Sequence, residues 1–318
     1  MLQKFLLVGS IGAMAFIFSA CGTGQSEVEV STEGPVTTYE PISYEQENYG
    51  VDQIRIAILI NEEDTAAQVV FEEFRSSLQE YLNIPVETIV GATHLVGIEA
   101  MRSGNLEMMW ASPFVYLLAR GALDVERLVT TDSPNVINKT VFITAQDDIK
   151  SLYDLEGRIF AFADTSSTSG FLYPMYHMIN FSGYTQEQLL TGSFFSHTPL
   201  SGGQTPSMMG VLYGDFDAAA VGFIQFNNAL NSGVIPADSI RIIGYTEMIP
   251  FPGYIATMEL PEELRRRIQN FLLEFLNDEH SIVRWNDPDV RFELPDQAQI
   301  DHLISMVETL GIDLENAG

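Results

Sequence analysis

The segment from Asp164 to Ser169 places one acid and five hydroxyl residues directly before a helical pattern. The apolar run 159–163 in front of it predicts a buried strand, and residues 170–181 follow with helical spacing. Free amides at a helix start, together with the helix dipole, favour negative charge. Ser and Thr also cap helices, so the residues alone leave anion binding and simple capping both open. The hydroxyls that would surround an anion belong to Ser167, Thr168 and Ser169.

Two other turns between an apolar run and a helical pattern carry polar or small residues, Asn61–Thr65 and Ser112–Pro113. In open α/β sheets, ligands bind beyond the carboxyl ends of the strands. Three such turns facing one cleft would form an anion pocket from uncharged donors, with Ser112 among them. Asp64, Glu63 and Glu247 are candidate proton acceptors for such a ligand, although each also fits a solvated position.

Apolar runs that predict strands alternate with amphipathic patterns that predict helices along most of the chain. Such alternation is typical of a parallel sheet covered by helices on both faces. The pattern starts again near residue 145, which indicates two similar lobes. The predicted strands are 54–60, 86–90, 106–110, 140–144, 158–163, 193–196, 216–221, 241–245 and 254–258. The predicted helices are 70–81, 93–104, one from Ser112, 170–181, 206–213, 261–276 and 296–310.

The composition limits the partners. The chain has 318 residues, of which 46% are hydrophobic, so it can bury a sizeable core and has the length of about two domains. Asp and Glu number 43 against 15 Lys and Arg, for a net charge of −28. This excess argues against nucleic acid as a partner, because phosphate backbones bind Lys and Arg. It also repels anions at long range, so an anion site must depend on local donors.

Motifs for other chemistries are missing from the sequence. It contains no GxxxxGK[ST], GxGxxG or GxSxG segment, and its five histidines form no HxH or HxxxH pair. With a single cysteine, Cys21, neither an internal disulfide nor a CxxC motif can form. We therefore expect no enzyme activity, no metal site and no cofactor.

The first 20 residues have the character of a signal peptide. Lys4 gives a positive start, residues 5–18 are apolar, and Ser19-Ala20-Cys21 provides small residues at a cleavage site. Phe18-Ser19-Ala20-Cys21 resembles a bacterial lipobox with Phe in place of the usual Leu, which implies lipidation of Cys21. An ordinary secretory signal with an incidental cysteine is the alternative. Residues 21–50 are polar and carry Gly and Pro without periodicity, which predicts a flexible tether.

Several motifs in order resemble the substrate-binding proteins of bacterial phosphate, phosphite and phosphonate ABC importers. The family pattern W-x-G-P-F-x-Y is approximated by WASPFVY at 110–116, and F-x-D-x-x-S-T-S-G-x-L-x-P is met by residues 162–174. Residues 217–221 match D-A-A-A-V, and residues 261–264 match P-x-E-L. The resemblance extends over residues 54–276.

This resemblance implies an α/β protein with the two-lobed type II periplasmic-binding fold. Each lobe would be a mostly parallel sheet flanked by helices, and two strands would form the hinge. Lobe 1 would comprise residues 51–143 and 245–318, and lobe 2 residues 144–244. The ligand would be held by the hydroxyls and amides of Ser167, Thr168 and Ser169, with Tyr116 donating from the opposite lobe.

The chain departs from the family pattern at two positions. Gly222 stands where many members have Asp after D-A-A-A-V, and Gln204 stands near where they tend to have Ser-His-Asp. In phosphonate binders, acidic and imidazole groups at such positions can receive a ligand amine or a phosphonic proton. Their absence argues against an aminoalkyl phosphonate and assigns Gln204 and Gly222 to the part of the site that selects the ligand.

The resemblance implies a monomeric extracytoplasmic lipoprotein that binds a small phosphorus oxyanion and delivers it to an ABC permease and its ATPase. Cys21 would anchor it to the bacterial cell membrane through lipid. The alternatives are a ligand sensor for a membrane receptor kinase, a binder of another oxyanion, and an enzyme on the same scaffold.

Overall fold

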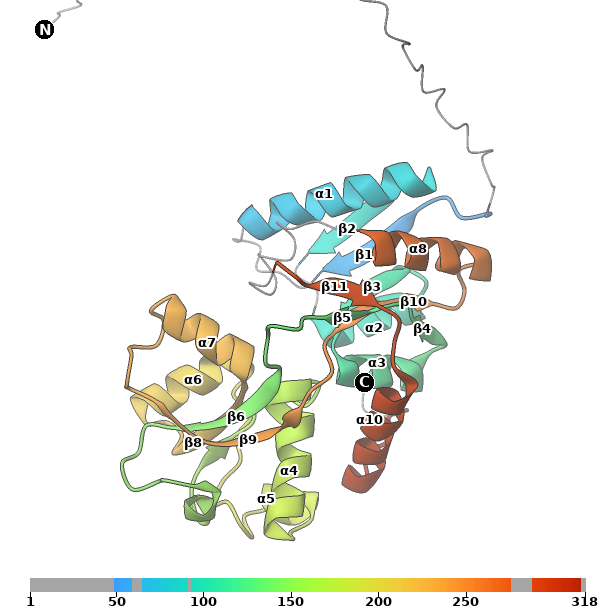
Figure 1. Cartoon of the computed structure of the whole chain (residues 1–318). Helices are drawn as coiled ribbons and strands as arrows, with labels where there is room; N and C mark the ends of the chain where they lie inside the picture. The colour runs from blue at the N-terminus through green and yellow to red at the C-terminus, as the bar shows by residue number, and fades with distance from the viewer. Residues whose placement is uncertain (1–48, 59–64, 91–92, 276–287, 316–318) are drawn as a thin grey trace, which may run out of the picture. The chain divides into compact units, whose positions relative to one another are not determined.

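Five strands form the first sheet, in the order β2 (Val86–Val90), β1 (Ile54–Ile58), β3 (Met108–Ala111), β10 (Gly253–Thr257) and β4 (Val125–Arg127). β1 pairs in parallel with β2 and β3, whereas β10 runs antiparallel to both β3 and β4. The computed structural model describes residues 49–58, 65–90, 93–275 and 288–315 (Figure 1).

Helices cover both faces of this sheet. On one face pack α1 (Thr65–Leu82) and α8 (Glu262–Glu274), whose buried side chains recur at helical spacing. Phe74 of α1 stacks on Tyr254 of β10 with ring centroids 5.4 Å apart. On the other face lie α2 (His94–Arg102), α3 (Pro113–Ala122) and α10 (Gln297–Leu310). The α1 and α8 side of the core contains Phe71, Phe74, Leu78, Leu264, Ile268 and Leu272.

Four strands form the second sheet, in the order β7 (Phe160–Ala161), β8 (Ala218–Gly222), β6 (Lys139–Thr144) and β9 (Arg241–Met248). α6 (Gln204–Tyr213) and α7 (Phe223–Asn231) pack on one face, and α4 (Tyr173–Ser182) packs on the other (Figure 1). A short helix, α5 (Gln186–Leu190), and a 3-10 turn, Leu152–Leu155, lie beside α4 and β9 respectively.

Two segments connect the sheets. The chain leaves the first sheet after β4, forms β5 (Thr130–Asp132) and enters β6, and it returns between β9 and β10. The crossings are hydrogen-bonded to each other, by Thr131 N–H to Pro252 O at 2.9 Å and by Ile249 N–H to Asn138 O at 2.8 Å. β11 (Arg291–Glu293) pairs with β5. The predicted lobe boundaries at 143/144 and 244/245 fall within β6 and β9, and the division into those lobes remains a prediction.

The sheets are mixed, where the sequence predicted mostly parallel ones. β10 and β6 run antiparallel to their neighbours, because each begins after the chain has crossed from the other sheet. No strand forms at 193–196; instead, His197 and Leu200 make isolated bridges with Ile159 and Phe162. The predicted helix at 170–181 begins as a π-helical turn, Thr168–Leu172, and continues as α4.

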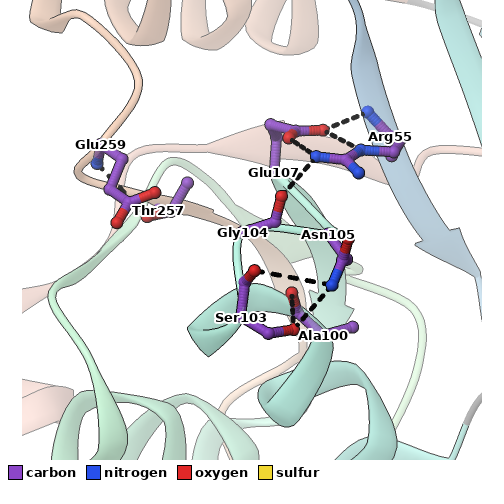
Figure 2. Close-up of polar contacts among 8 residues, drawn as sticks. All are labelled: Arg55, Ala100, Ser103, Gly104, Asn105, Glu107, Thr257 and Glu259. Atoms are coloured by element: carbon purple, nitrogen blue, oxygen red, sulfur yellow. Dashed lines mark hydrogen bonds and ion pairs between the residues drawn. The ribbon is translucent and has the colours of Figure 1, made fainter.

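An ion pair joins β1 to the segment before β3, at the amino ends of these strands (Figure 2). Glu107 Oε2 accepts from the backbone N–H of Arg55 at 2.6 Å and from its Nε at 3.0 Å, and Nη2 of Arg55 donates to Gly104 O at 2.7 Å. The side chains of Arg55 and Glu107 are 20% and 13% exposed, and the bond to Glu107 raises the pKa of Arg55. A hollow of about 360 Å³ adjoins the pair, at the sheet edge opposite Ser112.

We expect Glu107→Ala to lower the free energy of unfolding by about 2 kcal/mol, because Arg55 loses its counter-charge and a backbone N–H loses its acceptor. Urea unfolding followed by circular dichroism measures the change. Glu99→Ala removes the more exposed Arg102–Glu99 pair and should leave the free energy of unfolding almost unchanged. Equal losses in the two variants would contradict the structural role of the Arg55–Glu107 pair.

Candidate functional site

The turn between β7 and α4 is held by its own side chains. The carboxylate of Asp164 accepts from the N–H of Ser166 at 2.8 Å and from its hydroxyl at 2.6 Å. Ser167 Oγ accepts from the N–H of Gly170 at 3.0 Å and so caps the π-helical turn. The capping interpretation is therefore confirmed for Ser167, which leaves the Ser169 and Thr168 hydroxyls to make other contacts.

Thr168 contacts the first sheet. Its Oγ1 donates to Ser112 Oγ at 2.9 Å and accepts from the N–H of Phe114 at 3.0 Å. Ser112 is the N-cap residue of α3, but its side chain does not cap the helix. Thr168 is 5% exposed, so these bonds are shielded from water. The structure thus joins two predicted site residues that lie 56 positions apart.

Gln204, the first residue of α6, links the turn to the end of β8. Its Nε2 donates to Ser169 Oγ at 3.2 Å and to Ser167 Oγ at 3.4 Å. Its Oε1 accepts from the N–H of Gly222 at 2.8 Å. A Cβ on Gly222 would lie 3.0 Å from Ser169 Oγ and 2.1 Å from the Gln225 amide oxygen, so the backbone approaches closely here only because the residue is glycine.

Four helix starts meet at this network: those of α3, the Thr168–Leu172 turn, α6 and α7. Each start presents backbone N–H groups that have no acceptor within their own helix, together with the positive end of a dipole. The side chains between them are neutral donors, apart from the Asp164 carboxylate, which Ser166 occupies. This arrangement can stabilise a small anion, which would replace the hydrogen bonds that these groups now make with one another. The predicted residues that the structure brings together are Ser112, Ser167, Thr168, Ser169, Gln204 and Gly222.

Tyr116 lies apart from these contacts. Its ring is 7% exposed and lies near the guanidinium carbons of Arg120 and Arg127, at 5.7 and 5.9 Å from the ring centroid. Its N–H donates to Ser112 O at 3.0 Å, which places it one turn further along α3. Asp64 and Cys21 lie outside the described residues.

His94 lies near the candidate site, close enough to Asp164 for the two charges to interact, and the sequence did not reveal this. It is the first residue of α2, after the N-cap Thr93, whose side chain accepts from Val96 N–H. Burial lowers the pKa of His94, and the charge of Asp164, in the turn after β7, partly offsets this effect. His94 follows the carboxyl end of β2, at the same sheet edge as Ser112. Its position after a predicted strand could have indicated that it lies near the site.

The described part of the chain holds no cluster of three His, Cys, Asp or Glu side chains arranged to bind a metal. Within those same ranges, no helix combines the length and the apolar character needed to cross a membrane.

Known proteins share both the sequence pattern and the fold. Residues 56–297 match the family described as "ABC transporter, phosphonate, periplasmic substrate-binding protein". The chain belongs to this family. The phosphate-import protein PhnD of Mycolicibacterium smegmatis is 22% identical over 272 residues, which cover 83% of this chain and 80% of PhnD.

Solved relatives confirm the two-lobed type II periplasmic-binding fold. PhnD1 from Prochlorococcus marinus, in complex with methylphosphonate, superposes with a TM-score of 0.66 at 19% identity, over 82% of this chain and 98% of PhnD1. A binding protein component of an ABC phosphonate transporter from Pseudomonas aeruginosa gives a TM-score of 0.62 at 16% identity, over 83% and 96% of the two chains. The family consists of extracytoplasmic substrate-binding transport proteins, which implies a small ligand and an ABC permease with its ATPase as partners.

The pKa of His94, lowered below its ordinary value of 6.5, predicts a pH dependence of stability. Because the unfolded chain binds a proton more readily than the folded chain, the free energy of unfolding should fall as the pH drops through about 6.5. His177, whose pKa burial also lowers, should add to this decrease. Urea unfolding at about pH 7.5 and about pH 5.5 measures it.

His94→Gln should show a smaller decrease than the wild type, and His94→Gln combined with His177→Gln a smaller one still. The expectation fails if both variants lose as much stability as the wild type over this pH range.

Proposed function

We propose that this protein is an extracytoplasmic lipoprotein that captures a small phosphorus oxyanion, namely phosphate, phosphite or a simple phosphonate, for an ABC importer. The observation that carries the proposal is the network of neutral donors at four converging helix starts. Ser112 follows β3 of the first sheet, whereas the turn with Ser167, Thr168 and Ser169 follows β7 of the second sheet, on which Gln204 of α6 also packs.

Neutral donors suit an anion in a protein that carries a net charge of −28. The long-range field opposes the approach of an anion, so affinity has to come from short, desolvated contacts. A hydrogen bond to a charged group contributes roughly 1.5–3 kcal/mol. Four such bonds total roughly 6–12 kcal/mol, and an association cost of about 4 kcal/mol or more leaves a dissociation constant of about 1 μM at the tightest.

Gln204 and Gly222 favour an oxyanion without an amine. Gln204 uses its oxygen on the N–H of Gly222, and Gly222 has no side chain to accept from an ammonium group. The carboxylate of Asp164 is occupied by Ser166. Within this network, no described carboxylate is therefore free to bind the ammonium group of an aminoalkyl phosphonate. This supports phosphate, phosphite or methylphosphonate as the ligand.

Binding would proceed by closure of two lobes, one built on each sheet, without chemical conversion of the ligand. Tyr116 would stabilise the first turn of α3, through its backbone N–H bond to the carbonyl of Ser112, rather than contact the ligand. Asp64, which follows β1 in the sequence, would act as a proton acceptor for the ligand. The protein would act as a monomer, because each chain supplies the donors on both sheets.

The membrane anchor is the second part of the proposal. Residues 1–20 would be removed as a signal peptide, Cys21 would carry lipid, and residues 21–50 would form the tether. The extracytoplasmic location of the family supports this arrangement, since a lipid-anchored binding protein stays near its permease.

Isothermal titration with phosphate, phosphite and methylphosphonate should show binding of at least one of them. Ser167→Ala combined with Thr168→Ala should weaken that binding by at least about 100-fold, because two hydrogen bonds to a charged ligand are lost. The circular dichroism spectrum should be unchanged.

Ser305→Ala combined with Thr309→Ala is the matched control. It also removes one serine and one threonine hydroxyl, but from the exposed side of α10. This control should bind as the wild type does. Sulfate tests whether the site accepts another oxyanion. The proposal is wrong if the wild type binds none of the three phosphorus compounds, or if the Ser167 and Thr168 variant keeps its affinity.

Cys21→Ser should release the protein from the membrane fraction of expressing bacteria into the soluble extracytoplasmic fraction. Its affinity for the ligand should not change, because residues 21–50 lie before the folded region. Labelling with a radioactive fatty acid should mark the wild type alone. Label in both proteins, or membrane association of both, would contradict lipidation at Cys21.

A further inference from the structure

Arg127, the last residue of β4, is a buried cation. Its side chain is 5% exposed, and Nη2 donates to Thr130 Oγ1 at 3.0 Å and to the carbonyl oxygen of Phe251. Among the described residues, its Nε has no hydrogen-bond partner. Arg127 thus contacts both crossing segments, but only through neutral groups.

No described carboxylate forms an ion pair with Arg127. Arg265, which is 7% exposed, shows the usual arrangement, because its Nε donates to Glu126 Oε2 at 2.7 Å. For Arg127, burial lowers the pKa to about 10, and Tyr116 acts in the opposite direction. The guanidinium is therefore charged at neutral pH, and no carboxylate of the described residues balances its charge. Burying an unpaired charge is costly, so its presence suggests that something else supplies the negative charge.

The position of Arg127 relates it to the oxyanion network. Its guanidinium lies 5.9 Å from the ring centroid of Tyr116, one turn beyond Ser112 on α3. It also binds the carbonyl of Phe251, two residues before Gly253, which pairs with Ala111 at the end of β3. Tyr116 on one side and the segment from Phe251 to Gly253 on the other thus connect Arg127 to the first turn of α3, where Ser112 contacts Thr168.

We propose that Arg127 is the counter-charge of the bound oxyanion, acting through space from behind the first turn of α3. This inference rests on the proposed function and adds the residue that supplies charge to a site otherwise made of neutral donors. The guanidinium is fixed by Thr130 and Phe251, so it needs no rearrangement when the anion arrives. Because it is buried, salt screens it far less than it screens a surface arginine.

Titration calorimetry with phosphate, phosphite and methylphosphonate tests the inference in Arg127→Gln, Arg127→Met and Arg127→Lys. The charge-free variants should bind about tenfold more weakly or worse, because a positive charge near the anion is lost in a poorly screened region. The Lys variant should recover most of the affinity, which a purely structural role of the arginine would not explain. Thermal unfolding identifies the variants that fold; Arg127→Met introduces no polar group that would need a partner.

Arg120→Gln is the matched control. Arg120 lies at a similar distance from the same ring, 5.7 Å, but it is exposed on α3, so its loss should change affinity less than twofold and only at low salt. Wild-type affinity in Arg127→Gln, or equal weakening in the Gln and Lys variants, would overturn the inference and leave the proposed function intact. If the wild type binds none of the three compounds, the proposed function fails, and the inference fails with it.

Discussion

The hydroxyl of Thr168 connects the second sheet to the first turn of α3, and the candidate site depends on that connection. Thr168 donates to Ser112 and accepts from Phe114, while Thr140 of β6 donates to the carbonyl of the neighbouring Ser169 at 2.7 Å. The net contribution of one such bond is about 1 kcal/mol, so a charged ligand can displace it. The same hydroxyl therefore aligns the two sheets, and under the proposed function it would also bind the ligand.

The acidic surface and the neutral site act at different distances. Charges on the surface are screened within about 10 Å at moderate ionic strength, whereas the network at Thr168 is shielded from water. An anion that reaches the network meets dipoles and hydroxyls rather than competing salt bridges. Arg127 extends this division, because its charge lies inside the protein, where salt screens it less, and no described carboxylate forms an ion pair with it.

Much of the fold and part of the site follow from local sequence. The spacing of apolar residues in α1 and α8 predicts helices that bury one stripe, and the hydroxyl-rich turn predicts the contact region of Thr168. The antiparallel insertion of β10 was not predictable, because strand direction depends on where the chain crosses between sheets. His94 and Arg127 were missed because their burial and their contacts involve neighbours distant in sequence.

The two crossings differ in length, and this difference bears on how the sheets can move. The return crossing between β9 and β10 has only Ile249, Pro250, Phe251 and Pro252, whereas the outward path from β4 to β6 is longer and includes β5. Proline fixes φ, so Pro250 and Pro252, two of the four residues of the short crossing, cannot rotate about this torsion. Any rotation of one sheet against the other must then concentrate in the few torsions left there. The short crossing would set the axis of rotation, while the longer path follows it.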